Sequence, residues 1–256
     1  MKQFIAFTKK EILEQIRSGK LFIILLIFIV VGIMNPAITK LTPWIMDLLS
    51  DQLKQTGMAL PAVSVDAMTS WAQFYKNMPM AFIVFMIFFS GTFIVEFQHK
   101  TLINMITKGM VRYKIICAKM LVIVVLWTVG FWICYGITYG YNAYLWDNTI
   151  VNNLLCSAGM YWLCCVWIIS VIPLASALFN SLGACLLMEA AAVFVPYLLQ
   201  MIPKLSQYMP THLMDSVNLL INATTPNDYL WAIIISIGLI IINMVVSIIV
   251  FNKKEL

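Results

Sequence analysis

Charged residues are scarce in this sequence. They make up 11% of its 256 residues, whereas hydrophobic residues make up 62%. A soluble globular protein carries about 25% charged residues, because polar side chains must cover its surface. The composition therefore excludes an ordinary soluble fold. We expect one all-α polytopic membrane domain over residues 1–256, since helices satisfy their own backbone hydrogen bonds within lipid.

Uncharged runs locate the expected membrane spans. Four such runs contain between 19 and 27 residues, and a fifth, residues 148–188, contains 41. Because about 20 helical residues cross the hydrocarbon core, the longest run is sufficient for two helices. Its sequence FNSLG at residues 179–183 predicts the turn between them. The six expected spans are residues 21–39, 78–95, 117–139, 152–176, 182–202 and 229–251.

Positive charge is divided unequally between the two sides of this topology. Six spans place both termini on one side, and that side carries 12 of the 16 Lys and Arg residues. The positive-inside rule then places both termini in the cytoplasm, and we expect the cell membrane of a bacterium. The net charge of +5 follows from this topology and requires no nucleic-acid partner.

Motifs for catalysis, metal binding and nucleotide binding are missing as well. The two histidines, His99 and His212, are expected on opposite sides of the membrane, so they do not form a metal site together. The sequence contains no G-x-S-x-G nucleophile elbow and no G-x-x-x-x-G-K-[ST] phosphate-binding loop. The six cysteines lie in or at the ends of spans, which argues against a disulfide framework. We expect no enzyme activity, no metal and no cofactor in this chain.

Amphipathic patterns predict helices outside the spans. Residues 1–20 are basic with apolar residues at helical spacing, which is typical of a helix in the cytoplasmic interface. The alternative is an exposed extension of the first span. In the first external loop, Thr42-Pro43 is typical of a helix start and Ser64 of the N-cap of a second short helix. Pro210 predicts another external helix after the fifth span.

Glu189 is the one acidic residue inside an expected span. It lies seven residues into the fifth span, which is about 10 Å of helix. Because a charged side chain at the centre of a bilayer costs on the order of 3 kcal/mol, Glu189 must face protein or water. It either lines a translocation path or clamps two helices where residues 190–192, all alanine, allow close approach.

A charged segment, residues 96–116, separates the second and third spans. Thr101 is typical of a helix start and Gly109 of a helix end. A short cytoplasmic helix between them would expose an apolar edge, and such an edge indicates a docking partner. A helix that only rests on the inner leaflet is the alternative. The apolar edge consists of Leu102, Ile103, Met105 and Ile106.

The order of residues in this segment resembles the permeases of ABC-2 type ATP-binding-cassette transporters. In that family the second span ends in Glu, followed by Gly-Thr-Leu, a helical segment, Pro-x-Ser/Thr-Arg and then a Lys. Lys100, Gly109 and Val111 depart from this pattern. The six spans, the basic N-terminal helix and segments 71–79 and 202–213 extend the resemblance along the chain. The matching residues are Glu96, Thr101, Leu102, Arg112 and Lys119.

The resemblance implies a stand-alone permease subunit of an ABC exporter for amphiphiles such as peptides, antibiotics, drugs or lipids. Two permeases, identical or different, would form the translocation unit, and two ATPase subunits that bind ATP and Mg²⁺ would dock beneath them. Coupling would fall to Glu96 and residues 101–108, which end at Lys108, with Arg112 and Lys119 supporting the return to the membrane. The alternatives are a substrate-binding subunit of a vitamin importer and a structural or regulatory membrane protein.

Overall fold

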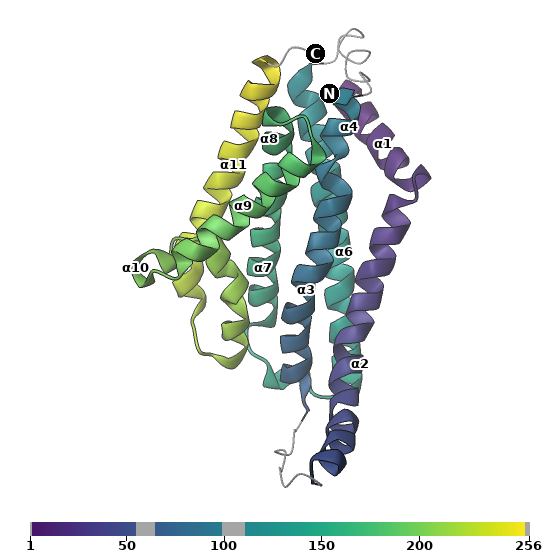
Figure 1. The fold of residues 1–256 in the computed structure, drawn as a ribbon, viewed down its shortest axis with the longest axis vertical. Helices are drawn as coiled ribbons and strands as arrows, with labels where there is room; N and C mark the ends of the chain where they lie inside the picture. The colour runs from purple at the N-terminus through teal and green to yellow at the C-terminus, as the bar shows by residue number, and fades with distance from the viewer. Residues whose placement is uncertain (1, 55–64, 99–110, 254–256) are drawn as a thin grey trace.

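The protein is a bundle of long helices. The computed structural model describes residues 2–54, 65–98 and 111–253, and within these ranges it contains helices and no strand. Six helical segments are long and apolar enough to cross a membrane, which confirms the predicted all-α, six-span fold. Figure 1 shows that α1, the start of α6 and the end of α11 lie at one end of the bundle.

The membrane-spanning segments have the predicted number and order. They cover Lys20–Leu48, Ala67–Val95, Arg112–Leu145, Leu154–Leu178, Leu182–Gln200 and Pro226–Lys253. The described elements are α1 Lys2–Arg17, α2 Lys20–Lys54, α3 Ala67–Ser90, α4 Thr92–Gln98, α6 Arg112–Leu145, η1 Asn148–Ile150, α7 Leu154–Ile169, α8 Val171–Leu178, α9 Leu182–Gln200, α10 Pro203–Ser206, η2 Pro210–Ile221, η3 Pro226–Tyr229 and α11 Leu230–Lys253, where η marks a 3₁₀ helix.

The first span is longer than predicted. α2 continues through both of its prolines, so the external helix predicted to start at Thr42-Pro43 is the last part of α2. Pro36 has no N–H to donate to the carbonyl of Gly32. Thr138 of α6 donates its hydroxyl to that carbonyl instead, at 3.1 Å. A neighbouring helix thus replaces the missing hydrogen bond, which lets α2 continue within the bundle.

The second span also begins before its predicted limit. Asp66 caps α3, because its carboxylate accepts a hydrogen bond from the backbone N–H of Thr69 at 2.8 Å. From this cap the helix runs without interruption into the membrane. The second external helix that the sequence predicts is therefore the first part of α3. Its predicted cap, Ser64, lies outside the described residues.

The fourth span is broken into α7 and α8 at Ser170. Asn243 of α11 donates its amide to Ser170 Oγ at 2.9 Å, so the break is held from a neighbouring helix. Pro173 lies in the first turn of α8, where its missing N–H breaks no helical hydrogen bond. The predicted turn at residues 179–183 is confirmed, since Ser181 caps α9 by accepting a hydrogen bond from the backbone N–H of Ala184.

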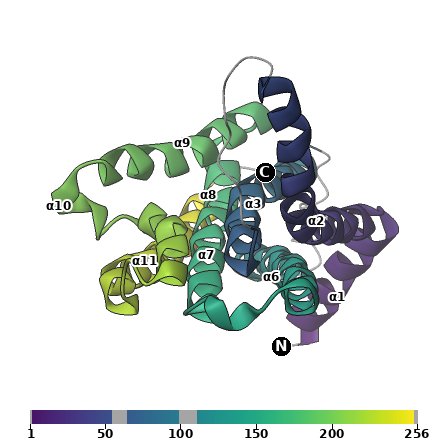
Figure 2. The same cartoon turned by 90° about the horizontal axis from the view of Figure 1, so that it is seen from below.

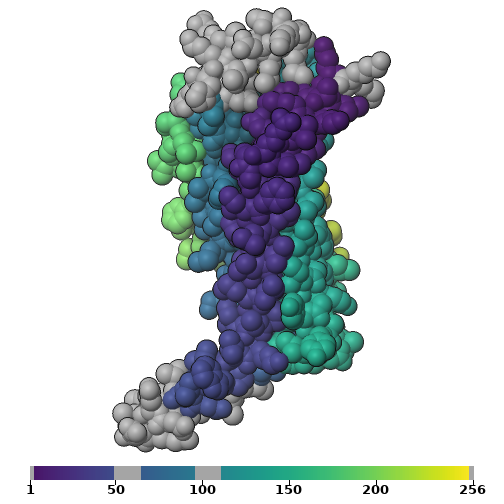
Figure 3. All heavy atoms as spheres, turned by 90° about the vertical axis from the view of Figure 1, so that its right-hand side faces the viewer, coloured from purple at the N-terminus to yellow at the C-terminus, as the bar shows by residue number. Residues whose placement is uncertain are grey.

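Aromatic rings fill the space between α2, α3 and α6. The Trp127 ring lies edge-on to three phenylalanine rings, with centroids 4.8 to 5.6 Å apart, a geometry that stabilises aromatic pairs beyond their buried area. Gly130 lies so close to Phe28 that a Cβ there would be 2.5 Å from the ring. Figure 3 shows α2 seated between α3 and α6 on this face. The three phenylalanines are Phe28, Phe82 and Phe85.

α9 leaves the bundle at an angle. Figures 1 and 2 show that it runs from its start near α8 outward to α10, away from the other spans. Cys185 and Glu189 are its only buried residues. The chain then returns through η2, which begins at Pro210 as predicted. Ser157 of α7 donates its hydroxyl to the carbonyl of Ser216 at 2.7 Å, which anchors η2 on the bundle.

Candidate functional site

A buried ion pair joins the N-terminal helix to the third span. Lys119 Nζ of α6 lies 2.7 Å from Glu11 Oε2 of α1, and the two side chains are 1% and 2% exposed. The ammonium group also lies 5.9 Å from the centre of the Phe7 ring, within range of a cation–π contact. Lys119, which the sequence predicts to support the coupling segment, therefore fixes α1 against α6.

The inward face of α1 carries two polar side chains beside Phe7. Phe7, Glu11 and Gln15 are buried against the bundle. Four other apolar residues point outward, an orientation typical of a helix that lies in the membrane interface. These exposed residues are Ile5, Ile12, Leu13 and Ile16.

Arg112 connects the start of α6 to the end of α11. Its Nη1 donates hydrogen bonds to the carbonyl oxygens of Phe251 at 2.9 Å and Asn252 at 3.1 Å. The last carbonyls of a helix have no partner within the helix, and a cation complements the negative end of the helix dipole. Arg112 thus closes the end of α11, a contact that the sequence does not reveal.

The side chains of the other predicted coupling residues lie outside the described part of the structure. Glu96 belongs to α4, but its side chain lies outside the described part of the structure. The role predicted for the remaining six stays a prediction, because they also lie outside the described residues. They are Thr101, Leu102, Ile103, Met105, Ile106 and Lys108.

Glu189 lies where the second and fifth spans meet. Its side chain is 4% exposed, and Ser90 at the end of α3 donates its hydroxyl to Glu189 Oε2. The second oxygen, Oε1, is buried without a hydrogen-bond partner. The helix-clamp interpretation of Glu189 therefore has a structural basis in Ser90, while one carboxyl oxygen remains without a protein donor.

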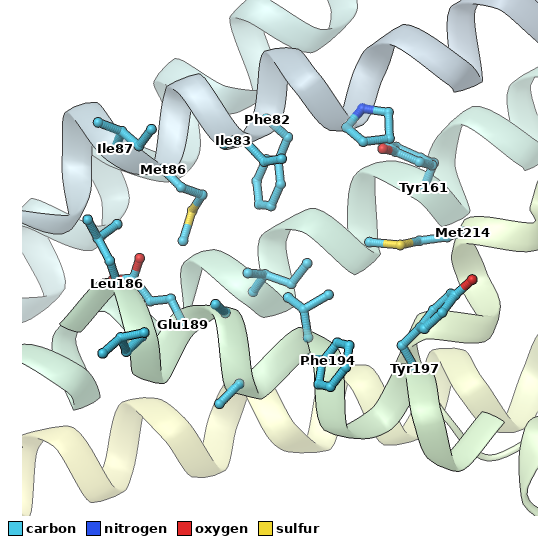
Figure 4. A pocket seen from close by; sticks show the side chains of 16 residues that line it. Phe82, Ile83, Met86, Ile87, Tyr161, Leu186, Glu189, Phe194, Tyr197 and Met214 are labelled. Atoms are coloured by element: carbon cyan, nitrogen blue, oxygen red, sulfur yellow. The ribbon is translucent and has the colours of Figure 1, made fainter. Parts of the chain in front are cut away.

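A groove of about 690 Å³ extends from Glu189 between α3, α7, α9 and η2, and we call it the α3–α9 groove. Figure 4 shows Phe82, Ile83, Met86 and Ile87 of α3 on one wall, facing Leu186 and Phe194 of α9 on the other. Tyr161 of α7 and Met214 of η2 lie toward the opposite end from Glu189. Binding sites for small molecules are commonly of this size and this apolar.

Two polar atoms in this groove have no partner. One is Glu189 Oε1 and the other is the hydroxyl of Tyr161, whose residue is 2% exposed. Sequence reasoning identified Glu189 but missed both Ser90 and Tyr161. The available signal was the spacing of Phe82, Met86 and Ser90, which places them on one face of α3.

Within the described residues, no three His, Cys, Asp or Glu side chains gather closely enough to hold an ion. His212 lies 3.7 Å from the carboxylate of Asp215 and stacks on Tyr229 with ring centres 4.7 Å apart. The contact with Asp215 lies within η2, and the stack on Tyr229 joins η2 to η3, so these contacts account for His212 as a packing residue.

Comparison with known proteins shows similarity to a transmembrane protein. The chain is similar to YxlG of Bacillus subtilis (strain 168), an uncharacterized transmembrane protein, with 24% identity over 262 residues. The similarity covers 100% of this chain and 99% of YxlG. This chain is a membrane protein. No family model matches it.

Proposed function

We propose that this membrane protein is the permease subunit of an ABC exporter. Separate ATPase subunits would bind ATP and Mg²⁺, and a second permease, identical or related, would complete the translocation unit. The chain would lie in the cell membrane of a bacterium with both termini in the cytoplasm. The proposal rests on the resemblance of residues 96–119 to ABC-2 permeases and on how the structure holds the residues that flank the undescribed part of that segment.

The observation that carries the proposal is the buried Lys119–Glu11 pair. It holds α1 beside the start of the third span, next to the segment that the resemblance assigns to ATPase docking. Arg112 attaches the end of α11 to the same place. A displacement of residues 96–116 by an ATPase would therefore move α1, α6 and α11 together.

The α3–α9 groove supports the transport part of the proposal. α3 is followed directly by α4, which leads into the docking segment, so a displacement there also shifts one wall of the groove. The opposite wall, α9, exposes Leu187 and Phe194 by 73% and 61%. An exposed apolar helix face fits contact with lipid or with a second permease.

The test is recovery of an ATPase partner. The tagged chain is purified from its native host in a mild detergent, and co-purifying proteins are identified by mass spectrometry. We expect a nucleotide-binding ABC subunit, and we expect its loss in the double variant Leu102→Asp/Ile106→Asp, because two carboxylates would abolish the apolar edge.

A matched control places an acid elsewhere at the same end of the bundle. Phe179 lies in the α8–α9 turn and is 40% exposed, so Phe179→Asp should leave the ATPase bound. The proposed function fails if no ATPase accompanies the wild-type chain while other membrane complexes of the host stay intact. Equal recovery with the double variant would refute docking through residues 101–108.

A further inference from the structure

We propose that the α3–α9 groove binds cationic amphiphiles, with a protonated amine at Glu189 and an apolar chain along α3 and α9. The inference rests on the proposed function in that it names the substrate class of the same permease. It depends on three features of the groove, namely its charge, its unpartnered atoms and its walls.

Within the part of the chain that the structure describes, Glu189 gives the groove a negative group that no basic lining residue balances. Among the described residues, the 16 that line it include no Lys, Arg or His, and Glu189 is the one acid. Ser90 supplies a neutral hydroxyl to Oε2 and leaves the carboxylate without a counter-ion there. A buried carboxylate without a cation is unfavourable, and an ammonium group on a ligand would offset that cost.

The unpartnered atoms mark two points along the groove. Glu189 Oε1 requires a hydrogen-bond donor, which a primary ammonium provides and a carboxylate or an ester does not. The Tyr161 hydroxyl can donate to a second polar group further along the ligand. Figure 4 shows these two residues toward opposite ends of the groove, with apolar side chains between them.

The walls suit an alkyl or acyl chain. Ile83 and Ile87 on α3 are 59% and 54% exposed, and Phe194 on α9 is 61% exposed. The groove is therefore open along one apolar side, so a ligand can enter from the lipid without crossing a polar surface. The combination of an apolar trough and a single buried acid selects an amphiphile with a positive head group.

The test is photolabelling of the purified chain in lipid nanodiscs. Two probes of equal length are compared, a diazirine-bearing hexadecylamine and the matching diazirine-bearing fatty acid, and labelled peptides are identified by mass spectrometry. We expect the amine to label groove residues of α3 and α9 about tenfold more than the acid, a ratio that corresponds to about 1.4 kcal/mol. In Glu189→Gln this ratio should fall toward one.

Tyr197→Phe is the matched control, because Tyr197 also lines the groove and the change removes a hydroxyl without altering the charge. It should retain the preference for the amine. Should Glu189→Gln fail to fold, unlabelled hexadecylamine and hexadecanol compete for the probe on wild-type protein, and the amine should compete better. Equal labelling by both probes, equal competition, or an unchanged ratio in Glu189→Gln would overturn the inference and identify the groove as a general lipid site.

This experiment uses neither nucleotide nor ATPase. A chain that selects amines but recovers no ATPase would refute the proposed ABC function and retain the binding site. A chain that recovers an ATPase but labels equally with both probes would refute the amine-binding site and retain the proposed ABC function.

Discussion

Removing either member of the Lys119–Glu11 pair should cost far more stability than removing an exposed ion pair of the same helix. At 2.7 Å, the Coulomb attraction is ~6 kcal/mol for an effective dielectric constant of about 20. Part of this is offset because each ion loses several kcal/mol of hydration on burial. Neutralising Glu11 removes the carboxylate that faces the buried Lys119 ammonium, and loss of one member of a buried pair costs about 3–5 kcal/mol. Neutralising Lys119 should cost less, because Lys10 Nζ also lies 3.0 Å from Glu11 Oε1.

A double-mutant cycle measures this effect. The variants are Glu11→Gln, Lys119→Met and their combination, and the free energy of unfolding is measured by SDS titration in mixed micelles. Glu11→Gln should lose about 3–5 kcal/mol, and Lys119→Met should lose less because Lys10 still pairs with Glu11. The combination should lose no more than Glu11→Gln alone, since the Lys119 charge is then absent as well.

Glu14 provides the control on the same helix. It pairs with Lys10 at 2.7 Å, a distance equal to that of the buried pair, but the two side chains are 50% and 43% exposed. Glu14→Gln should therefore cost no more than about 0.5 kcal/mol. Additive losses in the cycle, or an equal loss in Glu14→Gln and Glu11→Gln, would refute the reasoning that burial gives the pair its effect.

Three further changes test the helix contacts by the same unfolding measurement. Gly130→Ala should lose about 1–3 kcal/mol through its clash with Phe28, whereas Gly136→Ala, which meets no atom within 4 Å, should lose none. Thr138→Val should lose about 1–3 kcal/mol because the Gly32 carbonyl loses its donor and the Asn35 side-chain N–H loses its acceptor, and a neutral effect would contradict its role at Pro36. Asp66→Ala should lose about 1 kcal/mol with the cap of α3, and Asp66→Asn should retain most of that stability.

The spans could be predicted because charged residues mark their limits along the sequence. Lys20 and Arg112 begin their spanning segments, and residues 179–183 carry the small polar residues of the predicted turn. The continuation of α2 could not be predicted in the same way. The predicted span, residues 21–39, includes Pro36, but Thr42-Pro43 is typical of a new helix start, whereas α2 continues through it to Lys54.

The sequence predicts one residue of the candidate site, Glu189, but not the residues that surround it. Glu189 is conspicuous because an acid inside an apolar span is costly. Its partner Ser90 is 99 positions away, and small polar residues are common in membrane helices. Tyr161 comes from a third helix. Only the tertiary arrangement brings Glu189 and Tyr161 to one groove and Ser90 against Glu189, so the sequence alone identifies the acid but not the cavity.

The polar groups inside the bundle differ in how completely they are paired, and this difference separates packing from binding. Asn35 donates to Thr138 at 3.1 Å and accepts from Asn77 at 2.9 Å, so its side-chain amide is paired on both sides. Such a closed network holds helices together and has no capacity for a ligand. Glu189 has one oxygen paired and one without a donor, next to a groove large enough for a small molecule. A ligand in the groove can supply the hydrogen-bond donor that Glu189 Oε1 lacks, so the proposed binding of amines should depend on Glu189 rather than on Asn35.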